Sequence, residues 1–98
     1  MKWLEIIELR SLERNRTLLA SQLQKLIREV DKEADRQIVV YGRVMIDTDF
    51  SIHVLHDSNK VASSGSSLGL RLADGLKEYG LVNHSVWLEL PGNKCFDA

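Results

Sequence analysis

Two segments of this chain carry the apolar spacing of an α-helix, and each lies between segments patterned as β-strands. In residues 15–34 apolar side chains recur at intervals of three and four, while polar side chains fill the opposite face. Residues 67–79 show the same spacing. Because a sequence patterned for a helix does not suit a strand, the order of these segments restricts the possible folds strongly.

The segments around the predicted helices are rich in β-branched and aromatic residues. They predict strands at residues 3–10, 37–46, 50–56 and 82–90. The polar residues 47–49 join the second strand to the third, and so short a link predicts a hairpin.

Single residues predict where the helices begin and end. Asn15 or Thr17 is suited to cap the first helix, and Ser66 or Ser67 is suited to cap the second. Gly80 is placed to end the second helix in the left-handed conformation.

The polar, serine-rich residues 57–67 predict a flexible connection, the least ordered part of the chain by composition. Its end leads into the N-terminus of the second helix, a place that can bind phosphate. No Gly-Lys-Ser/Thr follows, however, so the stretch is not a P-loop, and the capped connection is favoured. Gly75 inside the second helix costs ~1 kcal/mol relative to alanine, so we expect that helix to approach the sheet closely.

The predicted order of elements is β-α-β-β-α-β. Right-handed crossovers over one antiparallel sheet turn this order into a ferredoxin-like sandwich, with strand order 4-1-3-2 and both helices on one face. Ninety-eight residues are enough for one domain, so we expect a single α+β domain over residues 1–98. It would contain the polar loop at 57–67 and end in a short tail at 91–98.

Charge and composition narrow the expected partners and location. The chain has 13 basic and 14 acidic residues, which argues against a nucleic-acid-binding protein. No stretch approaches the ~18 apolar residues of a membrane span, and Glu5 interrupts the apolar run that a signal peptide needs. The single cysteine, Cys95, cannot form an internal disulfide. We therefore expect a cytoplasmic protein with no membrane association.

Two helices can cover only one side of a four-stranded sheet, so the other side is expected to lie open. The residues expected to face the helices are Phe50, Ile52, Val54, Val86, Leu88 and Leu90. Those expected on the open side are Trp3, Glu5, Ile7, Leu9, His53, Leu55, Trp87 and Glu89. The second strand adds either Tyr41, Arg43 and Met45 or Ile38, Val40, Val44 and Ile46 to the open side.

An apolar open face predicts a covering partner, because soluble monomers seldom expose so much apolar surface. The favoured hypothesis is a homodimeric interaction domain or small-ligand-binding domain that associates through this face. The residues predicted for the ligand or dimer face are Trp3, Ile7, Leu9, Tyr41, Leu55, Trp87 and Glu89. Stacking of single-stranded RNA on the aromatic residues is a third hypothesis, which the net charge opposes.

The alternative from another class is a small cofactor-independent enzyme with a pocket at the sheet face. Its candidate catalytic residues are His53, Glu5 and Arg43, because buried charged groups among apolar neighbours are often functional. The same element order occurs in dimeric α+β barrel proteins, which include small monooxygenases, and in acylphosphatases. An acylphosphatase has a glycine-rich phosphate loop after its first strand. Residues 11–14 of this chain occupy that place and contain no glycine, which argues against an acylphosphatase. Whether the chain is an enzyme stays open, and no cofactor is expected.

The three histidines raise the question of a metal site. In the predicted topology His56 lies at the end of the third strand and His84 at the start of the fourth, which places them at opposite ends of the sheet. His53 points to the other face from His56. Three ligands around one ion would need another arrangement, so we expect ordinary surface or strand-end histidines and no metal.

Overall fold

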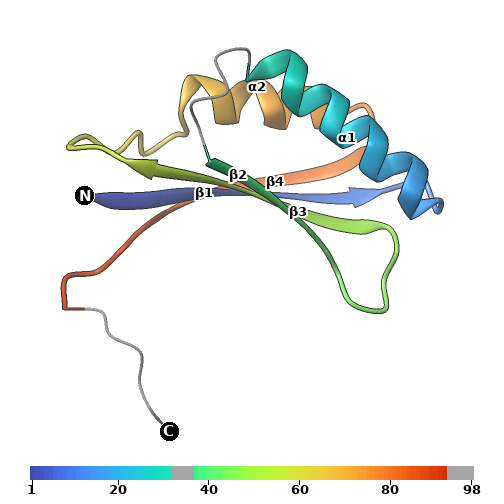
Figure 1. Cartoon of the computed structure of the whole chain (residues 1–98), viewed down its shortest axis with the longest axis horizontal. Coiled ribbons are helices and arrows are strands. Elements are labelled where there is room, and N and C mark those ends of the chain that lie inside the picture. Colours follow the sequence, from blue (N-terminus) through green and yellow to red (C-terminus); the bar gives the residue numbers. More distant parts are fainter. Residues whose placement is uncertain (32–36, 93–98) are drawn as a thin grey trace, which may run out of the picture.

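Both helices of the chain lie on one side of a single antiparallel sheet (Figure 1). The computed structural model describes residues 1–31 and 37–92. The elements in chain order are β1 (Lys2–Ser11), α1 (Arg16–Val30), β2 (Gln37–Gly42), β3 (Asp49–Asp57), α2 (Ser67–Leu76) and β4 (Gly80–Leu88). The sheet order is β2-β3-β1-β4, which is the predicted order 4-1-3-2 read from the other edge. The predicted ferredoxin-like fold is confirmed.

The predicted segment boundaries lie within two residues of the observed ones except at the C-terminal ends of α1, β2 and α2. Strand β2 was expected to reach residue 46, but it ends at Gly42 because the backbone turns: the amide N of Arg43 donates to the carbonyl O of Asp49, and Met45 is left-handed with φ 69°. Helix α1 ends at Val30. Residues 32–34, which were included in the predicted helix, lie outside the described residues, as do Cys95 and the rest of the tail from residue 93.

The helix caps follow the sequence prediction at the N-termini. The side chain of Asn15 accepts a hydrogen bond from the backbone N of Leu18, and that of Ser66 accepts one from Gly69. The prediction for Gly80 is wrong, because α2 ends at Leu76 and Gly80 opens β4 opposite Ser11. A Cβ at Gly80 would collide with the backbone of Arg10, so close strand approach explains this glycine.

The face of β1 is the largest difference from the sequence prediction. Trp3, Glu5, Ile7 and Leu9 were expected on the open side, but all four are buried and point toward the helices. Pairing decides the face: Glu5 lies opposite Val54 on β3 and Val86 on β4, so it shares their side of the sheet. Both faces of β1 carry apolar residues, and alternation alone could not choose between them.

The other strands turn the expected residues toward the helix side, where Leu88 is still 46% exposed. Phe50, Ile52, Val54, Val86 and Leu88 all share the helix side, while Leu90 lies beyond the end of β4. On β2, Ile38 and Val40 face the helices and Tyr41 faces the open side. The core joins these strands to both helices, and its fully buried members include Ile7, Leu9, Leu19, Leu23, Ile52, Leu72 and Leu76.

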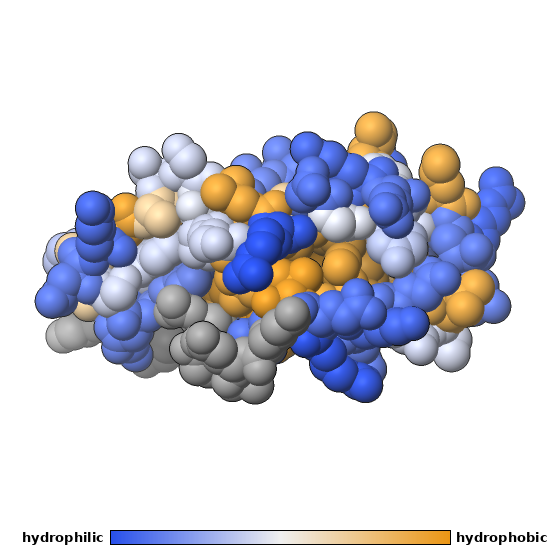
Figure 2. All heavy atoms as spheres, turned by 90° about the horizontal axis from the view of Figure 1, so that it is seen from above, coloured by the Kyte–Doolittle hydropathy of each residue, from blue (hydrophilic) through white to orange (hydrophobic). Residues whose placement is uncertain are grey.

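The outer surface of the helix side is mostly hydrophilic, with hydrophobic atoms visible between the polar groups (Figure 2). A Cβ at Gly75 would meet the side chain of Leu26 on α1. The close approach expected from Gly75 is therefore between the two helices rather than between α2 and the sheet. No helix within residues 1–31 and 37–92 is long and apolar enough to cross a membrane.

Candidate functional site

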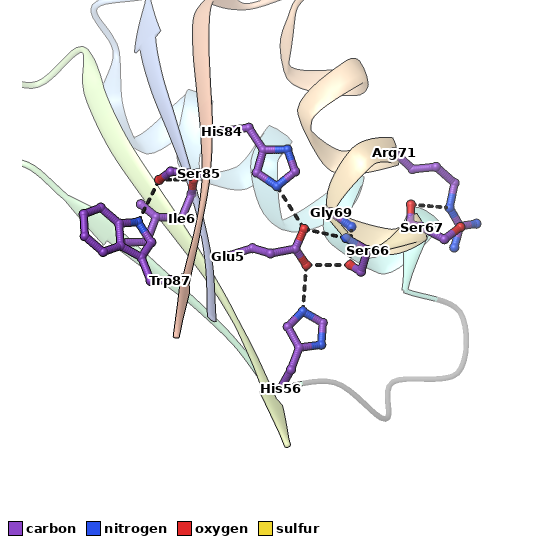
Figure 3. Close-up of polar contacts among 10 residues, drawn as sticks. All are labelled: Glu5, Ile6, His56, Ser66, Ser67, Gly69, Arg71, His84, Ser85 and Trp87. Atoms are coloured by element: carbon purple, nitrogen blue, oxygen red, sulfur yellow. Dashed lines mark hydrogen bonds and ion pairs between the residues drawn. The ribbon is translucent and has the colours of Figure 1, made fainter. Parts of the chain in front are cut away.

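A buried carboxylate on the helix side of the sheet gathers polar groups from three other parts of the chain. Glu5 lies in the middle of β1 and its side chain is fully buried. His56, Ser66 and His84 surround its two oxygens (Figure 3). We call these four residues the Glu5 cluster. A charged group in such a place requires hydrogen-bonding partners, and the cluster supplies them.

Each oxygen of the Glu5 carboxylate has two partners. Oε2 lies 2.6 Å from Nε2 of His56 and accepts a hydrogen bond of 2.5 Å from the hydroxyl of Ser66. Oε1 lies 2.9 Å from Nε2 of His84 and accepts a hydrogen bond of 2.9 Å from the backbone N of Ser66. The cluster thus connects β1 to β3, to β4 and to the start of α2.

Strand pairing brings the two histidines to one carboxylate. His56 lies opposite Trp3 and His84 lies opposite Ile7, so the two rings flank Glu5 from the neighbouring strands on either side of β1. The prediction that they occupy opposite ends of the sheet is wrong, because β4 begins at Gly80 and His84 is well inside it. His56 does lie near the end of β3, as predicted. Neither residue is a surface histidine, however, because the side chains of His56 and His84 are 1% and 15% exposed.

Two glycines leave room for the cluster. A Cβ at Gly69, in the first turn of α2, would overlap the carboxylate of Glu5. Gly65 has φ +104°, which favours glycine, and a Cβ there would press on the ring of His84. The expectation that residues 57–67 form a flexible connection is therefore wrong at its C-terminal end, which is hydrogen-bonded into the site.

The N-terminus of α2 does hold an anion, and the anion belongs to the chain itself. Ser66 is the N-cap of α2, and both its backbone N and its hydroxyl bind the carboxylate of Glu5. Free amide groups and the helix dipole stabilise negative charge at such a place. The helix end that the sequence marked as a possible phosphate site is thus occupied by Glu5.

Glu5 is held in its ionised form. Burial by itself would raise the pKa of the Glu5 carboxyl, but hydrogen bonds from Ser66, His56 and His84 to the charged form outweigh this effect. As a result the pKa of Glu5 lies below its ordinary value. A carboxylate in this state can orient imidazole rings by accepting their hydrogen bonds.

An aromatic stack closes one side of the cluster. The rings of Trp3 and His56 lie 3.8 Å apart at an angle of 12°, and the indole Nε1 of Trp3 donates to the hydroxyl of Ser58. Trp3 therefore fixes the ring of His56 instead of facing a partner. Among the residues that the structure describes, no group of three histidine, cysteine or carboxylate side chains is arranged to hold a metal ion.

The three catalytic candidates from the sequence do not come together. Glu5 lies on the helix side, whereas His53 lies on the open side, where its Nε2 is 3.1 Å from the hydroxyl of Ser51. Arg43 is exposed in the turn after β2 and pairs with Asp49 at 3.1 Å. Only Glu5 has a buried polar environment.

The open side of the sheet carries four rows of side chains that cross the strands in the order β4, β1, β3, β2, and the pair of Lys2 and Asp57 lies beyond the first row. Tyr41, Leu55 and Trp87 lie on this face as predicted, and Glu89 follows the end of β4. In Figure 3, Trp87 and Ser85 lie on the other side of the strands from Glu5. The rows are Trp87, Leu4, Leu55 and Gln37; Ser85, Ile6, His53 and Val39; Asn83, Glu8, Ser51 and Tyr41; and Leu81, Arg10 and Asp49.

Of the four rows, the first forms an apolar end and the last a charged end, and the charged pair of Lys2 and Asp57 lies beyond the first row. At the apolar end, a shallow hollow of about 730 Å³ includes Leu4, Leu55 and Trp87 in its lining. At the charged end a second hollow of about 510 Å³ is lined by residues that include Arg10, Tyr41 and Asp49. The face keeps large apolar groups in contact with solvent, since Leu55 and Trp87 are 39% and 56% exposed.

Solved structures share this fold. The protein Rv0793 from Mycobacterium tuberculosis superposes with a TM-score of 0.62 at 15% identity, over 96% of this chain and 100% of that one. A "putative antibiotic biosynthesis monooxygenase" from Nitrosomonas europaea superposes with a TM-score of 0.58 at 12% identity, over 90% of this chain and 98% of that one. These similarities show that the chain shares the ferredoxin-like fold of both structures. No protein-family model and no curated protein matches the sequence.

Sequence reasoning missed the site's main partners. The sequence prediction gives His56, His84 and Ser66 separate roles, and it treats Gly65 and Gly69 only as members of the stretch that leads into the second helix. One signal was available: a glutamate on the same strand face as Ile7 and Leu9 must find a hydrogen-bond donor if that face is buried. This requirement could be applied only once it was known which face of β1 is buried.

Proposed function

We propose that this protein is a homodimeric binding domain in which two copies pack open face against open face and enclose a site for a small apolar molecule. The observation that carries the proposal is the row of Trp87, Leu4, Leu55 and Gln37, whose large apolar groups are left in solvent by a single chain. Exposed apolar surface of this kind favours association. A cytoplasmic location, expected from the composition, belongs to the same proposal.

The hollow at the apolar end supports the ligand part of the proposal. Its volume is in the range of about 300–1,000 Å³ that is usual for small-molecule sites. The indole Nε1 of Trp87 donates to the hydroxyl of Ser85 at 2.8 Å, which fixes the ring as one wall. A second copy over the open face would convert this open hollow into an enclosed one, with polar groups of Gln37 and Lys2 at its rim.

Oligomeric state tests the dimer. Leu55→Glu places a charge in the apolar row and is expected to give a monomer by light scattering at micromolar concentration, as is Trp87→Glu. Leu70→Glu is the matched control, because Leu70 is 49% exposed but lies on α2, on the other side of the sheet. It should leave the dimer intact. A wild-type monomer, or equal loss of the dimer in Leu55→Glu and Leu70→Glu, would overturn the proposal.

Binding of the apolar fluorescent probe 1-anilinonaphthalene-8-sulfonate tests the ligand site. We expect saturable binding to the folded dimer, with affinity reduced roughly tenfold or more in Trp87→Ala, because the loss of one large aromatic wall is worth about 1.5–3 kcal/mol. Leu70→Ala should bind as the wild type does. Equal binding by Trp87→Ala and wild type would contradict a site at the apolar end.

A second candidate function, a small cofactor-independent enzyme, has one specific observation in its favour. The ionised Glu5 holds the ring of His84, which is the partly exposed member of the cluster, in the manner of an oriented acid-base group. One structural neighbour is described as a monooxygenase. Oxygen consumption over a panel of phenolic compounds tests this proposal: turnover that falls at least tenfold in His84→Gln would support it, and a silent wild type would count against it.

A further inference from the structure

We infer that the two-fold axis of the proposed dimer runs along the strands, between β1 and β3, so that each row of the open face meets the same row of its partner. In this arrangement Arg10 of one copy pairs with Asp49 of the other. The inference rests on the proposed dimer and adds its register. It follows from the order of side chains in the four rows, which makes the face complementary to itself.

An axis along the strands, at the centre of the sheet, places β1 over the partner's β3 and β4 over the partner's β2. The first row then sets Leu4 on the partner's Leu55, and the third sets Glu8 on the hydroxyl of the partner's Ser51. The last row sets Arg10 on the partner's Asp49. Leu4 thus meets an apolar group, and Glu8 and Arg10 each meet a polar group or an opposite charge. Elsewhere in the rows apolar side chains meet neutral polar ones, Ile6 on the partner's His53 and Trp87 on the partner's Gln37, so no charge is set against an apolar group.

A two-fold packing with its axis across the strands is disfavoured. It would place β1 over the partner's β1 in the reverse direction, so that Glu8 covers Ile6 and Arg10 covers Leu4. Charged groups would then be buried against apolar side chains without a partner, which costs several kcal/mol per ion. Electrostatic complementarity therefore selects the axis along the strands.

The last row, which contains Arg10 and Asp49, can form an ion pair between the two chains. Within one chain, both Arg10 and Arg43 approach the carboxylate of Asp49, with Arg43 at 3.1 Å and Arg10 at 3.7 Å. The side chain of Arg10 is 69% exposed. In the dimer each Asp49 would keep its own Arg43 and gain the partner's Arg10, while Asp49 is already largely shielded from water.

The turn between β2 and β3 extends the same interface. Figure 1 shows this turn, in green, descending on the side of the sheet away from the helices. Its tip carries the exposed Val44 and Met45, and Met45 holds a left-handed conformation that is unusual for a large side chain. With the axis along the strands, the turn of one copy reaches the start of the partner's β4, where Leu81 is 74% exposed.

The size of the face fits a second copy. Four strands about 4.8 Å apart, of six to ten residues each, cover roughly 550 Å² in projection. The side chains and the turn add to this area. Stable dimers of standard size bury about 800 Å² per partner. The open face and the turn together are therefore of the size that a second copy requires.

Mixing two charge-reversal variants tests the register. Arg10→Glu alone would place two carboxylates opposite each other across the interface, and Asp49→Arg alone would place two guanidinium groups opposite each other. The dissociation constant of each variant's homodimer should therefore rise roughly tenfold or more. Mixed together they should form a heterodimer of near wild-type affinity, because both inter-chain pairs are then opposite in charge. Pairing within one chain is unchanged by mixing and cannot explain such a rescue. Circular dichroism checks that both variants are folded.

Cross-linking gives a second measurement that does not depend on charge. In a Cys95→Ser background, a mixture of Leu4→Cys and Leu55→Cys chains should be joined by a short bismaleimide, whereas a mixture of Leu4→Cys and Arg10→Cys should not. The reverse result would show the axis across the strands and overturn the inference, as would failure of the charge variants to rescue each other. In either case, a wild-type dimer that becomes a monomer in Leu55→Glu would still support the proposed function.

Discussion

The Oε1 atom of Glu5 lies 2.9 Å from Nε2 of His84, although 79 positions separate the two residues in the chain. The other oxygen of the same carboxylate meets His56, 51 positions away. One side chain therefore ties the central strand β1 to both of its neighbours, and through Ser66 to α2. Four elements depend on a single buried charge, which makes the Glu5 cluster sensitive to small changes.

Glu5→Gln should lower the free energy of unfolding by about 2–4 kcal/mol. Glutamine has nearly the same shape, but its NH₂ group would face donors, and the hydrogen bonds to a charged acceptor would be lost. Urea unfolding followed by circular dichroism measures the change. The exposed Glu78→Gln is the control and should stay within about 0.5 kcal/mol of wild type. Similar values for the two variants would show that the cluster contributes little.

Stability should fall in acid because of Glu5. The pKa of Glu5 is lowered in the folded protein, so below the ordinary carboxyl pKa of 4.5 the unfolded chain takes up a proton that the folded chain does not. The contribution of Glu5 is therefore fully present above about pH 4.5 and is lost as the pH falls through the lower, folded pKa. Melting temperatures measured from pH 6 down to pH 3 should decline less steeply in Glu5→Gln than in wild type. Parallel curves would be inconsistent with an ionised Glu5.

Two glycine-to-alanine changes in the same helix should behave differently. Gly69→Ala puts a methyl group into the space of the Glu5 carboxylate and should destabilise the protein by about 2 kcal/mol. Gly75→Ala meets only the end of the flexible Leu26 side chain and gains about 1 kcal/mol of helix propensity, so it should stay within about 1 kcal/mol of wild type. Thermal or urea unfolding of the pair provides the comparison. Equal effects would mean that the space around Glu5 is not tight.

Arg16→Lys should loosen the turn between β2 and β3. The Nη2 atom of Arg16 donates to the carbonyl O of Arg43 and of Ile46, both at 2.6 Å, and its guanidinium lies over the ring of Phe50. Lysine cannot reproduce this planar, two-acceptor geometry. We expect amide hydrogen exchange in residues 43–47 to become roughly tenfold faster, equivalent to about 1.4 kcal/mol of local stability. The exposed Arg14→Lys should leave the exchange of this turn unchanged.

The order of the elements could be read from the sequence because it depends on local periodicity. The helical spacing of Leu19 and Leu23 and the alternation of Phe50, Ile52 and Val54 each reflect one face that must be buried. The N-caps at Asn15 and Ser66 are equally local, since each side chain bonds a backbone N three residues on.

The sequence by itself therefore determined the βαββαβ order, the helix caps and the core faces of β3 and β4. Only the tertiary structure decided which face of β1 is buried, because both faces are apolar and the choice depends on register with strands far away in the chain. As a result, Trp3 and Glu5 lie on the helix side and not on the open side, where the sequence predicts them. It also brought His56 and His84 to one carboxylate, since a buried charge is stabilised only where distant donors converge on it.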